Sequence, residues 1–156
     1  MKIESAAQDF SAIIEEATTA DAIIFGAPTY MVDMSAPLKA FFEASSAVWF
    51  TLGWKDKVAG GFTNSLNFAG DKANSPSSIL TLAMQQGMIW VGIGLSPGAH
   101  NNSDAAPDVV NRLGYYVGVA TQSDNAAPDI TPPPGDREFA RLYSVRVTEI
   151  TKKMKG

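Results

Sequence analysis

The sequence contains no cysteine and only one histidine, His100, among its 156 residues. Without cysteine the chain can form neither a disulfide framework nor a thiolate zinc site. A single histidine also excludes a histidine-rich metal site within one chain. No apolar run approaches the roughly 20 residues that a membrane-spanning helix needs, and the first residues lack the apolar core of a secretory signal. These absences favour a cytoplasmic protein with no membrane partner and no metal.

Basic residues are scarce as well. Twelve Lys and Arg stand against sixteen Asp and Glu, which gives a net charge of −4 and a pI near 4.9. Nucleic-acid-binding proteins normally carry an excess of positive charge, so we expect no nucleic-acid partner. The hydrophobic share of 46% and the charged share of 18% are typical of globular proteins. The length suits one domain, which we expect to comprise residues 1–156.

Short apolar runs alternate with amphipathic segments along the chain. The apolar runs are typical of buried parallel strands and occupy residues 21–26, 57–62, 88–93 and 115–120. Helical spacing is found at residues 5–17, 35–45, 75–87 and 136–154. This order predicts an α/β domain with a mostly parallel sheet. Ser35 and Asp136 are expected to cap helices, with Asp136 on a solvated face.

Two further features of this pattern carry predictions. Gly60 and Gly61 interrupt the second apolar run, which indicates close approach by another backbone or ring. Residues 95–112 have no regular period and contain Gly, Pro, Asn and Asp. A segment of that length inside a compact domain is usually a functional loop or an insertion.

Ligands of open α/β sheets bind beyond the carboxyl ends of the strands. Two loops follow such ends here, at residues 27–34 and 63–71. Both offer backbone N–H groups, small polar side chains and one aromatic ring. The sequence therefore predicts a site for a flat, polar heteroaromatic ligand rather than for a metal or a free phosphate.

The most specific motif is GAPTY at residues 26–30, followed by MS at residues 34–35. It resembles the third strand and flavin loop of flavodoxin-like NAD(P)H:quinone oxidoreductases of the tryptophan-repressor-binding-protein type, and of the related NADPH-dependent FMN reductases. Weaker matches follow in the same order at residues 48–49, 55–59, 86–91, 111–114 and 135–136. The resemblance thus covers nearly the whole chain and implies a flavodoxin-like three-layer αβα fold.

This resemblance also implies which residues would bind the isoalloxazine ring of FMN. The ring contacts would come from Pro28, Thr29, Tyr30 and Met31 in the first loop and from Thr63, Asn64, Ser65, Asn67 and Gly70 in the second. Gln86 stands where some members have a histidine near the flavin. Trp49 matches a tryptophan that approaches the flavin of a neighbouring subunit in the family. Residues 95–112 match the insertion that splits the last strand in long-chain members.

The sequence departs from the family pattern in two places. Residues 67–69 replace part of a glycine run in the second loop. The family begins with an apolar strand and a Ser/Thr-rich loop that binds the FMN phosphate at a helix N-terminus, whereas residues 1–20 resemble the segment before the third strand. We therefore expect an absent first βαβ unit and weak FMN binding. We also expect an unpaired strand edge at residues 22–26, which favours a homo-oligomer.

The function implied by the resemblance is that of an FMN-dependent NAD(P)H oxidoreductase that reduces quinones or free flavin. FMN would be the cofactor and NAD(P)H the electron donor, so no catalytic acid, base or nucleophile is required of the chain. Two alternatives remain open. The chain could be a flavodoxin-type electron carrier, or a non-catalytic assembly module that has lost FMN. The first loop could instead be an ordinary strand-to-helix turn, although the longer match to the flavin loop favours a site, and the second could as readily be a polar surface loop.

Overall fold

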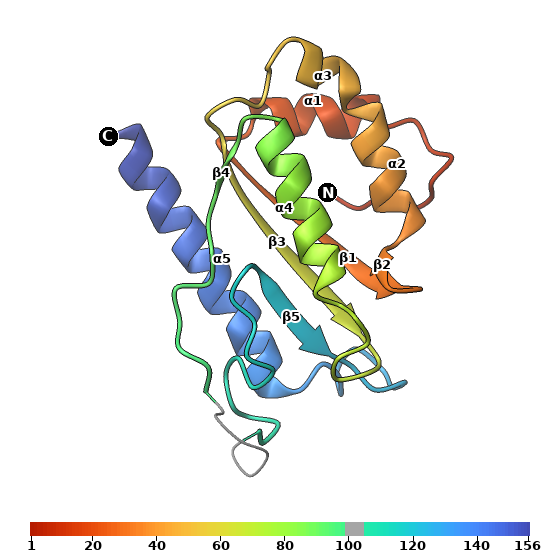
Figure 1. Ribbon diagram of the computed structural model, residues 1–156, viewed down its shortest axis with the longest axis vertical. Coiled ribbons are helices and arrows are strands. Elements are labelled where there is room, and N and C mark those ends of the chain that lie inside the picture. The colour runs from red at the N-terminus through yellow and green to blue at the C-terminus, as the bar shows by residue number, and fades with distance from the viewer. Residues whose placement is uncertain (99–104) are drawn as a thin grey trace.

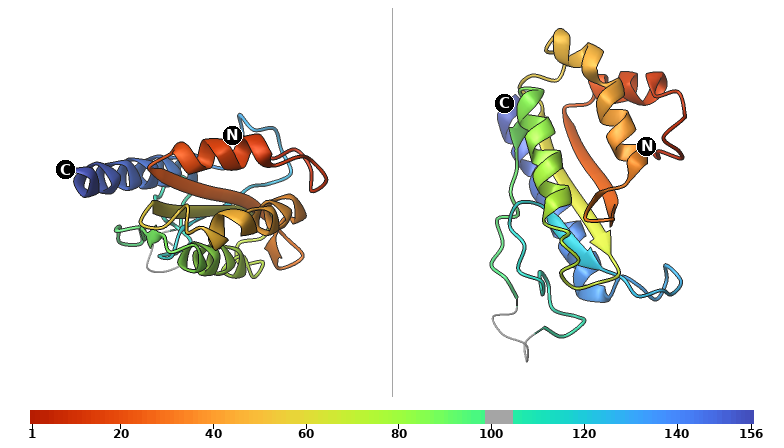
Figure 2. Two further views of the ribbon diagram at one scale, coloured as in Figure 1. Left: turned by 90° about the horizontal axis from the view of Figure 1, so that it is seen from above. Right: turned by 45° about the vertical axis from the view of Figure 1, so that its right-hand side comes forward.

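The computed structural model describes residues 1–98 and 105–156, so His100 lies outside the described residues. The elements follow in the order α1 (Ser11–Thr19), β1 (Ala22–Tyr30), β2 (Asp33–Met34), α2 (Ala36–Ala44), α3 (Ser46–Phe50), β3 (Val58–Ser65), α4 (Asn74–Gln85), β4 (Ile89–Trp90), β5 (Val119–Gln122) and α5 (Pro134–Lys155). Helices lie on both sides of a mostly parallel sheet (Figure 1; Figure 2), which confirms the predicted α/β class.

The sheet is built around β1 and β3, which pair in parallel from residues 22–28 to residues 58–64. Both β4 and β5 pair in parallel with the other edge of β3. Residues 89–90 pair near its start, and residues 119–122 pair near its end. The chain between β4 and β5 thus leaves the sheet and returns to the same edge. This arrangement splits one strand position into two, as the resemblance implied for the insertion.

Two apolar clusters cover the two faces of the sheet. The larger joins α1, α2 and α4 to the inward side chains of β1, and Phe25, Phe41 and Trp54 form its aromatic centre. The Phe41 and Trp54 rings stack with their centroids 6.1 Å apart. The smaller cluster packs α5 against the opposite face through Phe139 and Val147. Alternate residues along the strands face these two layers, which follows from the two-residue period of a strand.

The close approach predicted at the paired glycines is made by the side chain of Tyr143 on α5. A Cβ atom at Gly60 would lie 2.5 Å from the Tyr143 hydroxyl oxygen, too close for any larger residue. That hydroxyl accepts a hydrogen bond from the Gly61 N–H at 3.2 Å and donates one to the Val91 carbonyl at 2.6 Å. Glycine therefore lets α5 pack directly on β3.

The strand boundaries differ from the sequence-based prediction. β1 continues through Pro28, Thr29 and Tyr30, which the sequence assigned to a loop, and β3 continues to Ser65. A parallel pairing extends both strands. Pro28 lies opposite Asn64 in β3. Proline has no N–H to donate, and none is needed here because this part of Pro28 faces the edge of β1 away from β3. On that edge the Pro28 carbonyl accepts a hydrogen bond from the Ser35 N–H. The turn comes later, at residues 31 and 32, both of which have positive φ angles.

Three other boundaries were wrong. The first helix begins at Ser11 rather than at residue 5, the run at 88–93 forms a strand only at residues 89–90, and the last strand lies at 119–122 rather than at 115–120. The bounds of both late strands were predicted from apolar composition alone, and composition does not show which apolar residues pair in a sheet. Val91 and Ile93 are buried in the α5 cluster although they lie outside the strand.

One edge of β1 has little pairing. β2 pairs with β1 only at Thr29 and Tyr30, and within the described ranges no strand pairs with residues 22–28 on that side. Residues 1–4 line a groove of about 960 Å³ along this edge without forming a strand. The expected unpaired edge is therefore found within the described part of the chain.

Candidate functional site

A pocket of about 600 Å³ lies at the carboxyl ends of β1 and β3 and beside the residues that follow β5. Three segments line it, at residues 28–32, at residues 64–67 with 70–71, and at residues 123–125. Because β1, β3 and β5 run parallel, the loops after them meet at one edge of the sheet (Figure 1). This is the edge at which the sequence predicts a ligand site. We call this cavity the strand-end pocket.

Most of the residues predicted to contact a ring line the strand-end pocket. They are Pro28, Thr29, Tyr30, Met31, Asn64, Ser65, Asn67 and Gly70. Thr63 lies behind them and is fully buried. Its hydroxyl is 2.7 Å from that of Thr29, which is in turn 2.7 Å from the hydroxyl of Ser75. This chain of hydroxyl groups connects β1, β3 and the first turn of α4 beneath the pocket.

Gln86 is not brought to this pocket. It follows α4, whose first turn lies near Thr29, and the twelve residues of that helix span about 18 Å. Gln86 is only 1% exposed and donates from Nε2 to the Ser45 hydroxyl at 3.0 Å. Within one chain the structure therefore does not bring Gln86 to the two loops, because Ser45 fixes its amide at the other end of α4, and its contact with a flavin stays a prediction.

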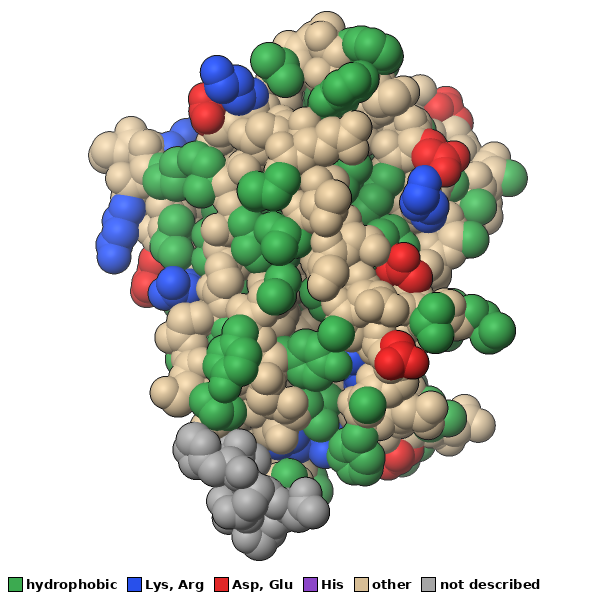
Figure 3. All heavy atoms as spheres, in the orientation of Figure 1, with side chains coloured by type: hydrophobic (Ala, Val, Ile, Leu, Met, Phe, Trp, Pro, Cys, Tyr) green, Lys and Arg blue, Asp and Glu red, His purple; other side chains and the backbone are tan. Residues whose placement is uncertain are grey.

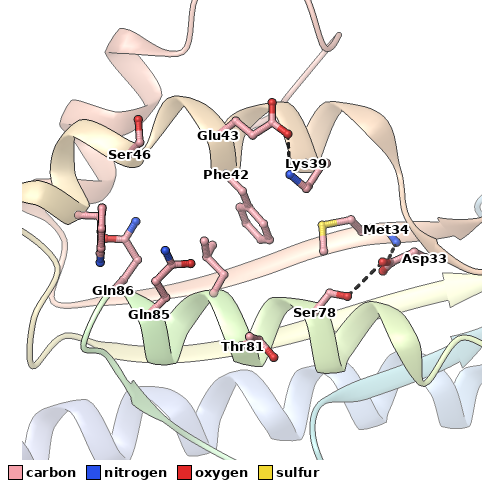
Figure 4. Close-up of a pocket in the computed structure, with 12 residues that line it drawn as sticks. Asp33, Met34, Lys39, Phe42, Glu43, Ser46, Ser78, Thr81, Gln85 and Gln86 are labelled. Atoms are coloured by element: carbon pink, nitrogen blue, oxygen red, sulfur yellow. Dashed lines mark hydrogen bonds and ion pairs between the residues drawn. The ribbon is translucent and has the colours of Figure 1, made fainter.

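Gln86 instead lines a groove of about 480 Å³ between α2 and α4 (Figure 4). Gln85 and Ser46 lie at the same end of this groove, and Asp33 and Ser78 lie at the other end. Trp49 also lines it and is 37% exposed. Trp49 and Gln86, which the resemblance places near a flavin, thus share a surface groove that is separate from the strand-end pocket.

The side chain of Asn64 is oriented by its neighbours. Its Oδ1 accepts hydrogen bonds from the Thr121 hydroxyl at 2.7 Å and from the Ser123 hydroxyl at 3.1 Å. Its Nδ2 makes no hydrogen bond to the described residues. Because Asn64 lines the pocket, the amide can offer N–H donors to a ligand while its oxygen is held by the protein.

Sequence reasoning missed a buried ion pair that supports the pocket. Arg112 Nε lies 2.9 Å from Asp136 Oδ1, and both side chains are nearly inaccessible. Asp136 also accepts a hydrogen bond from the Gln122 N–H at 2.8 Å. The Gln122 amide accepts from Arg112 at 3.0 Å and donates to the Leu66 carbonyl in the second loop at 2.9 Å. The expectation that Asp136 caps α5 on a solvated face was therefore wrong.

Lys72 was missed as well. It follows the second loop, is fully buried, and donates from Nζ to the Thr121 carbonyl at 2.7 Å. Burial lowers the pKa of Lys72 to about 8; the charge of Asp136 opposes this shift, and the charge of Arg112 adds to it. A lysine in a polar stretch of sequence gives no sign of burial, so no pattern could have identified it.

The accessible wall of the pocket combines exposed apolar side chains with carboxylates. Tyr30, Met31 and Leu66 are among the most exposed apolar residues of the described chain. Asp71 and Asp124 also line the pocket, whereas its described lining includes no lysine or arginine. Figure 3 shows Lys and Arg side chains on the α5 side of the molecule and over α2, and a few such atoms between other side chains near its lower end. The lining therefore fits a flat polar ring, and it offers a phosphate group no cation.

Two further properties hold for the described residues. No group of three or more His, Asp or Glu side chains in residues 1–98 and 105–156 is arranged to hold a metal ion. Within the same ranges, no helix combines the length and the apolar character needed to cross a membrane.

Comparison with known proteins gives a consistent family. Residues 2–103 match the family model for NADPH-dependent FMN reductase. The chain is 44% identical over 135 residues to "Flavodoxin FldP" of Pseudomonas aeruginosa, which is 86% of this chain and 72% of that protein. It is 31% identical over 147 residues to "Quinone-oxidoreductase QR2" of Triphysaria versicolor, covering 90% of this chain and 66% of the relative.

A solved structure has the same fold. The crystal structure of a WrbA-like flavodoxin from Agrobacterium tumefaciens superposes with a TM-score of 0.74 at 35% identity, over 97% of this chain and 78% of that one. A relative called NAD(P)H dehydrogenase (quinone), from Geobacter metallireducens, is 28% identical over 92% of this chain and 68% of its own length. The flavodoxin-like fold expected from the sequence is thus confirmed, and the chain belongs to the NADPH-dependent FMN reductase family.

Proposed function

We propose that this chain is an FMN-dependent oxidoreductase that uses NAD(P)H to reduce quinones or free flavin. The observation that supports it most is the meeting of three strand-end segments around one pocket of ring-sized volume with oriented polar groups. Membership of the family supports oxidoreductase chemistry with FMN, and relatives called NAD(P)H dehydrogenase (quinone) support the choice of donor and acceptor.

Different residues of the pocket would contact different parts of the ring. Tyr30 and Met31 offer exposed apolar surface for one face. Asn64 would donate from Nδ2 to a ring carbonyl, since Thr121 and Ser123 already occupy its oxygen. When bound, FMN supplies the redox chemistry by accepting a hydride and passing electrons on. The chain itself binds and orients the ring and excludes water from its inner face.

Replacing the amide nitrogen of Asn64 by an oxygen, in the variant Asn64→Asp, tests this proposal. Asn64→Asp keeps an acceptor for Thr121 and Ser123 but removes both N–H donors and adds negative charge. We expect flavin affinity, measured by fluorescence quenching, to fall at least about tenfold, since a lost hydrogen bond and the added charge together exceed about 1.4 kcal/mol. NADPH oxidation in the presence of FMN and benzoquinone should fall in parallel.

The matched control is Gln8→Glu, which makes the same amide-to-acid change outside the strand-end pocket and keeps an acceptor for the Glu4 and Ser5 N–H groups. It should leave flavin affinity unchanged. The proposal fails if the wild-type chain binds no flavin, or if the Asn64 and Gln8 variants bind it equally well.

A flavodoxin-type electron carrier is the second candidate. Its support is the 44% identity to a relative called a flavodoxin, which is higher than the 28% and 31% identities to the two quinone-reducing relatives. A carrier would bind flavin yet oxidise NADPH only when a separate reductase is added. Steady NADPH oxidation by the purified chain with FMN and a quinone would exclude it.

The assembly proposed for this function is a homo-oligomer. Within the described chain no strand pairs with the edge of β1 at residues 22–28, and such edges pair readily with other chains. Trp49 and Gln86 share a groove outside the strand-end pocket. In an oligomer Trp49 would approach a flavin bound by a neighbouring subunit, as the family resemblance implies.

A further inference from the structure

A buried lysine stands directly behind the strand-end pocket. Gly70 and Asp71 line the pocket, but the next side chain, Lys72, turns inward and is fully buried. Its Nζ donates to the Thr121 carbonyl at 2.7 Å, and the Thr121 hydroxyl donates to Asn64 Oδ1 at 2.7 Å. The ammonium group is therefore connected through one residue to a side chain of the pocket wall.

Keeping this lysine charged costs stability. Burial lowers the pKa of Lys72 to about 8, so the ammonium is still protonated at neutral pH but is held there unfavourably. Its one hydrogen bond to the described residues goes to a carbonyl, not to a carboxylate. Strongly shifted pKa values cluster at functional sites, where activity and stability conflict.

The layer of buried charges behind the pocket has an excess of positive charge. Lys72 and Arg112 supply two cations, and Asp136 from α5 supplies one carboxylate. β5 contributes Thr121 and Gln122, neither of which titrates. Asp71 and Asp124 on the pocket wall are solvent-exposed, so water and salt screen them more strongly than the buried groups. Tyr115, whose pKa is raised by burial and by Asp71, is neutral at pH 7.

We propose that Lys72 is a positioning residue whose buried charge makes the strand-end pocket favour the reduced state of a bound flavin over the oxidised state. The inference rests on the proposed function. Hydride transfer delivers two electrons and one proton, so a ring that accepts hydride gains one negative charge unless it takes up a second proton from water. A fixed cation behind the site stabilises that charge without having to reorganise. Lys72 also binds the carbonyl of Thr121, whose hydroxyl donates to Asn64 Oδ1, so it helps to hold the Asn64 side chain in place.

The first test compares the affinities of riboflavin in its two redox states. Wild type, Lys72→Met and Lys72→Arg are titrated anaerobically with oxidised and with dithionite-reduced riboflavin, from about one unit below to about two units above the Lys72 pKa of about 8. At pH 7 we expect the wild-type preference for reduced over oxidised riboflavin to exceed that of Lys72→Met by about tenfold, which is about 30 mV for a two-electron couple. In the wild type this additional preference for reduced riboflavin should disappear above pH 8. In Lys72→Arg it should persist, because arginine stays charged over this pH range. Comparing variants at each pH cancels the protonation of riboflavin itself.

The second test needs no ligand. Between pH 8 and pH 10.5 the unfolded chain binds more protons at Lys72 than the folded chain does, so the wild-type free energy of unfolding should rise with pH relative to that of Lys72→Met. At pH 7 the methionine variant should be at least as stable as wild type. If it is clearly less stable, Lys72 has a structural role and the proposal is overturned.

The outcomes separate this inference from the proposed function. If wild type binds riboflavin but Lys72→Met shows the same preference between redox states, only the role of Lys72 is refuted. If wild type binds riboflavin in neither redox state, both proposals fall. If the preference follows the charge at position 72 and its pH dependence, the inference is supported.

Discussion

Replacing Arg112 by methionine removes the cation of the buried ion pair and leaves Asp136 in place. The two side chains are only 4% and 1% exposed, and two contacts of 2.9 and 3.2 Å join them. Breaking a buried pair from one side costs about 3–5 kcal/mol, because the remaining charge is uncompensated. Asp136 keeps its hydrogen bond from the Gln122 N–H, so we expect a loss at the lower end of that range, about 3 kcal/mol. That is a large part of a typical stability of about 5–15 kcal/mol.

Urea unfolding followed by tryptophan fluorescence and circular dichroism measures this loss as a fall in midpoint at constant slope. The matched control is Arg141→Met, which breaks a 2.7 Å pair with Glu138 on the exposed surface of α5. Exposed pairs contribute little, so this control should match wild type. Adding Asp136→Asn to Arg112→Met should recover part of the loss by removing the orphaned charge. Equal stability of the two single variants would refute the argument that the buried pair anchors the pocket.

Three further predictions concern the pocket and the sheet edge. FMN and riboflavin should bind with affinities within about threefold of each other, since the described pocket lining has Asp71 and Asp124 but no cation; calorimetric titration showing FMN far tighter would reveal a phosphate site. Tyr30→Ala should weaken flavin binding about fivefold, through about 1 kcal/mol of lost aromatic contact, with Tyr116→Ala, an exposed tyrosine outside the pocket, as control. Sedimentation velocity should show a dimer or larger species at micromolar concentration, and Ile24→Lys at the β1 edge should shift it toward monomer; a stable wild-type monomer would contradict the edge argument.

The parts of the fold that follow from local patterns were predictable. The runs around Ile23 and Ala59 are apolar on both faces, and this pattern by itself identifies buried parallel strands. Their ends were not predictable, because Pro28 and Asn64 look like loop residues and become strand residues only by pairing with each other. The split of the last strand was anticipated from the resemblance, yet the paired residues in β4 and β5 were set by tertiary contacts with β3.

The candidate site also has a part that local sequence patterns predict and a part that only tertiary contacts decide. The two loops could be found because each follows an apolar strand, and parallel strands bring such loops together. Lys72, Arg112 and Asp136 could not be found, because charged residues in polar stretches are normally solvated and only the folded chain shows that these three are buried together. The position of Gln86 could not be predicted for a related reason: its distance from the loops depends on the length and direction of α4.

The most direct test of a flavin site at the strand ends is to map flavin contacts on the protein by NMR. Backbone and side-chain amide shifts of the ¹⁵N-labelled chain would be recorded during titration with FMN. We predict that shifts concentrate at residues 29–32, 64–67, 70–71 and 123–125, which line the strand-end pocket, with the Asn64 side-chain amide among the largest. Shifts confined to Trp49, Gln85 and Gln86 in the groove between α2 and α4, or no shifts at saturating FMN, would contradict this placement of the site.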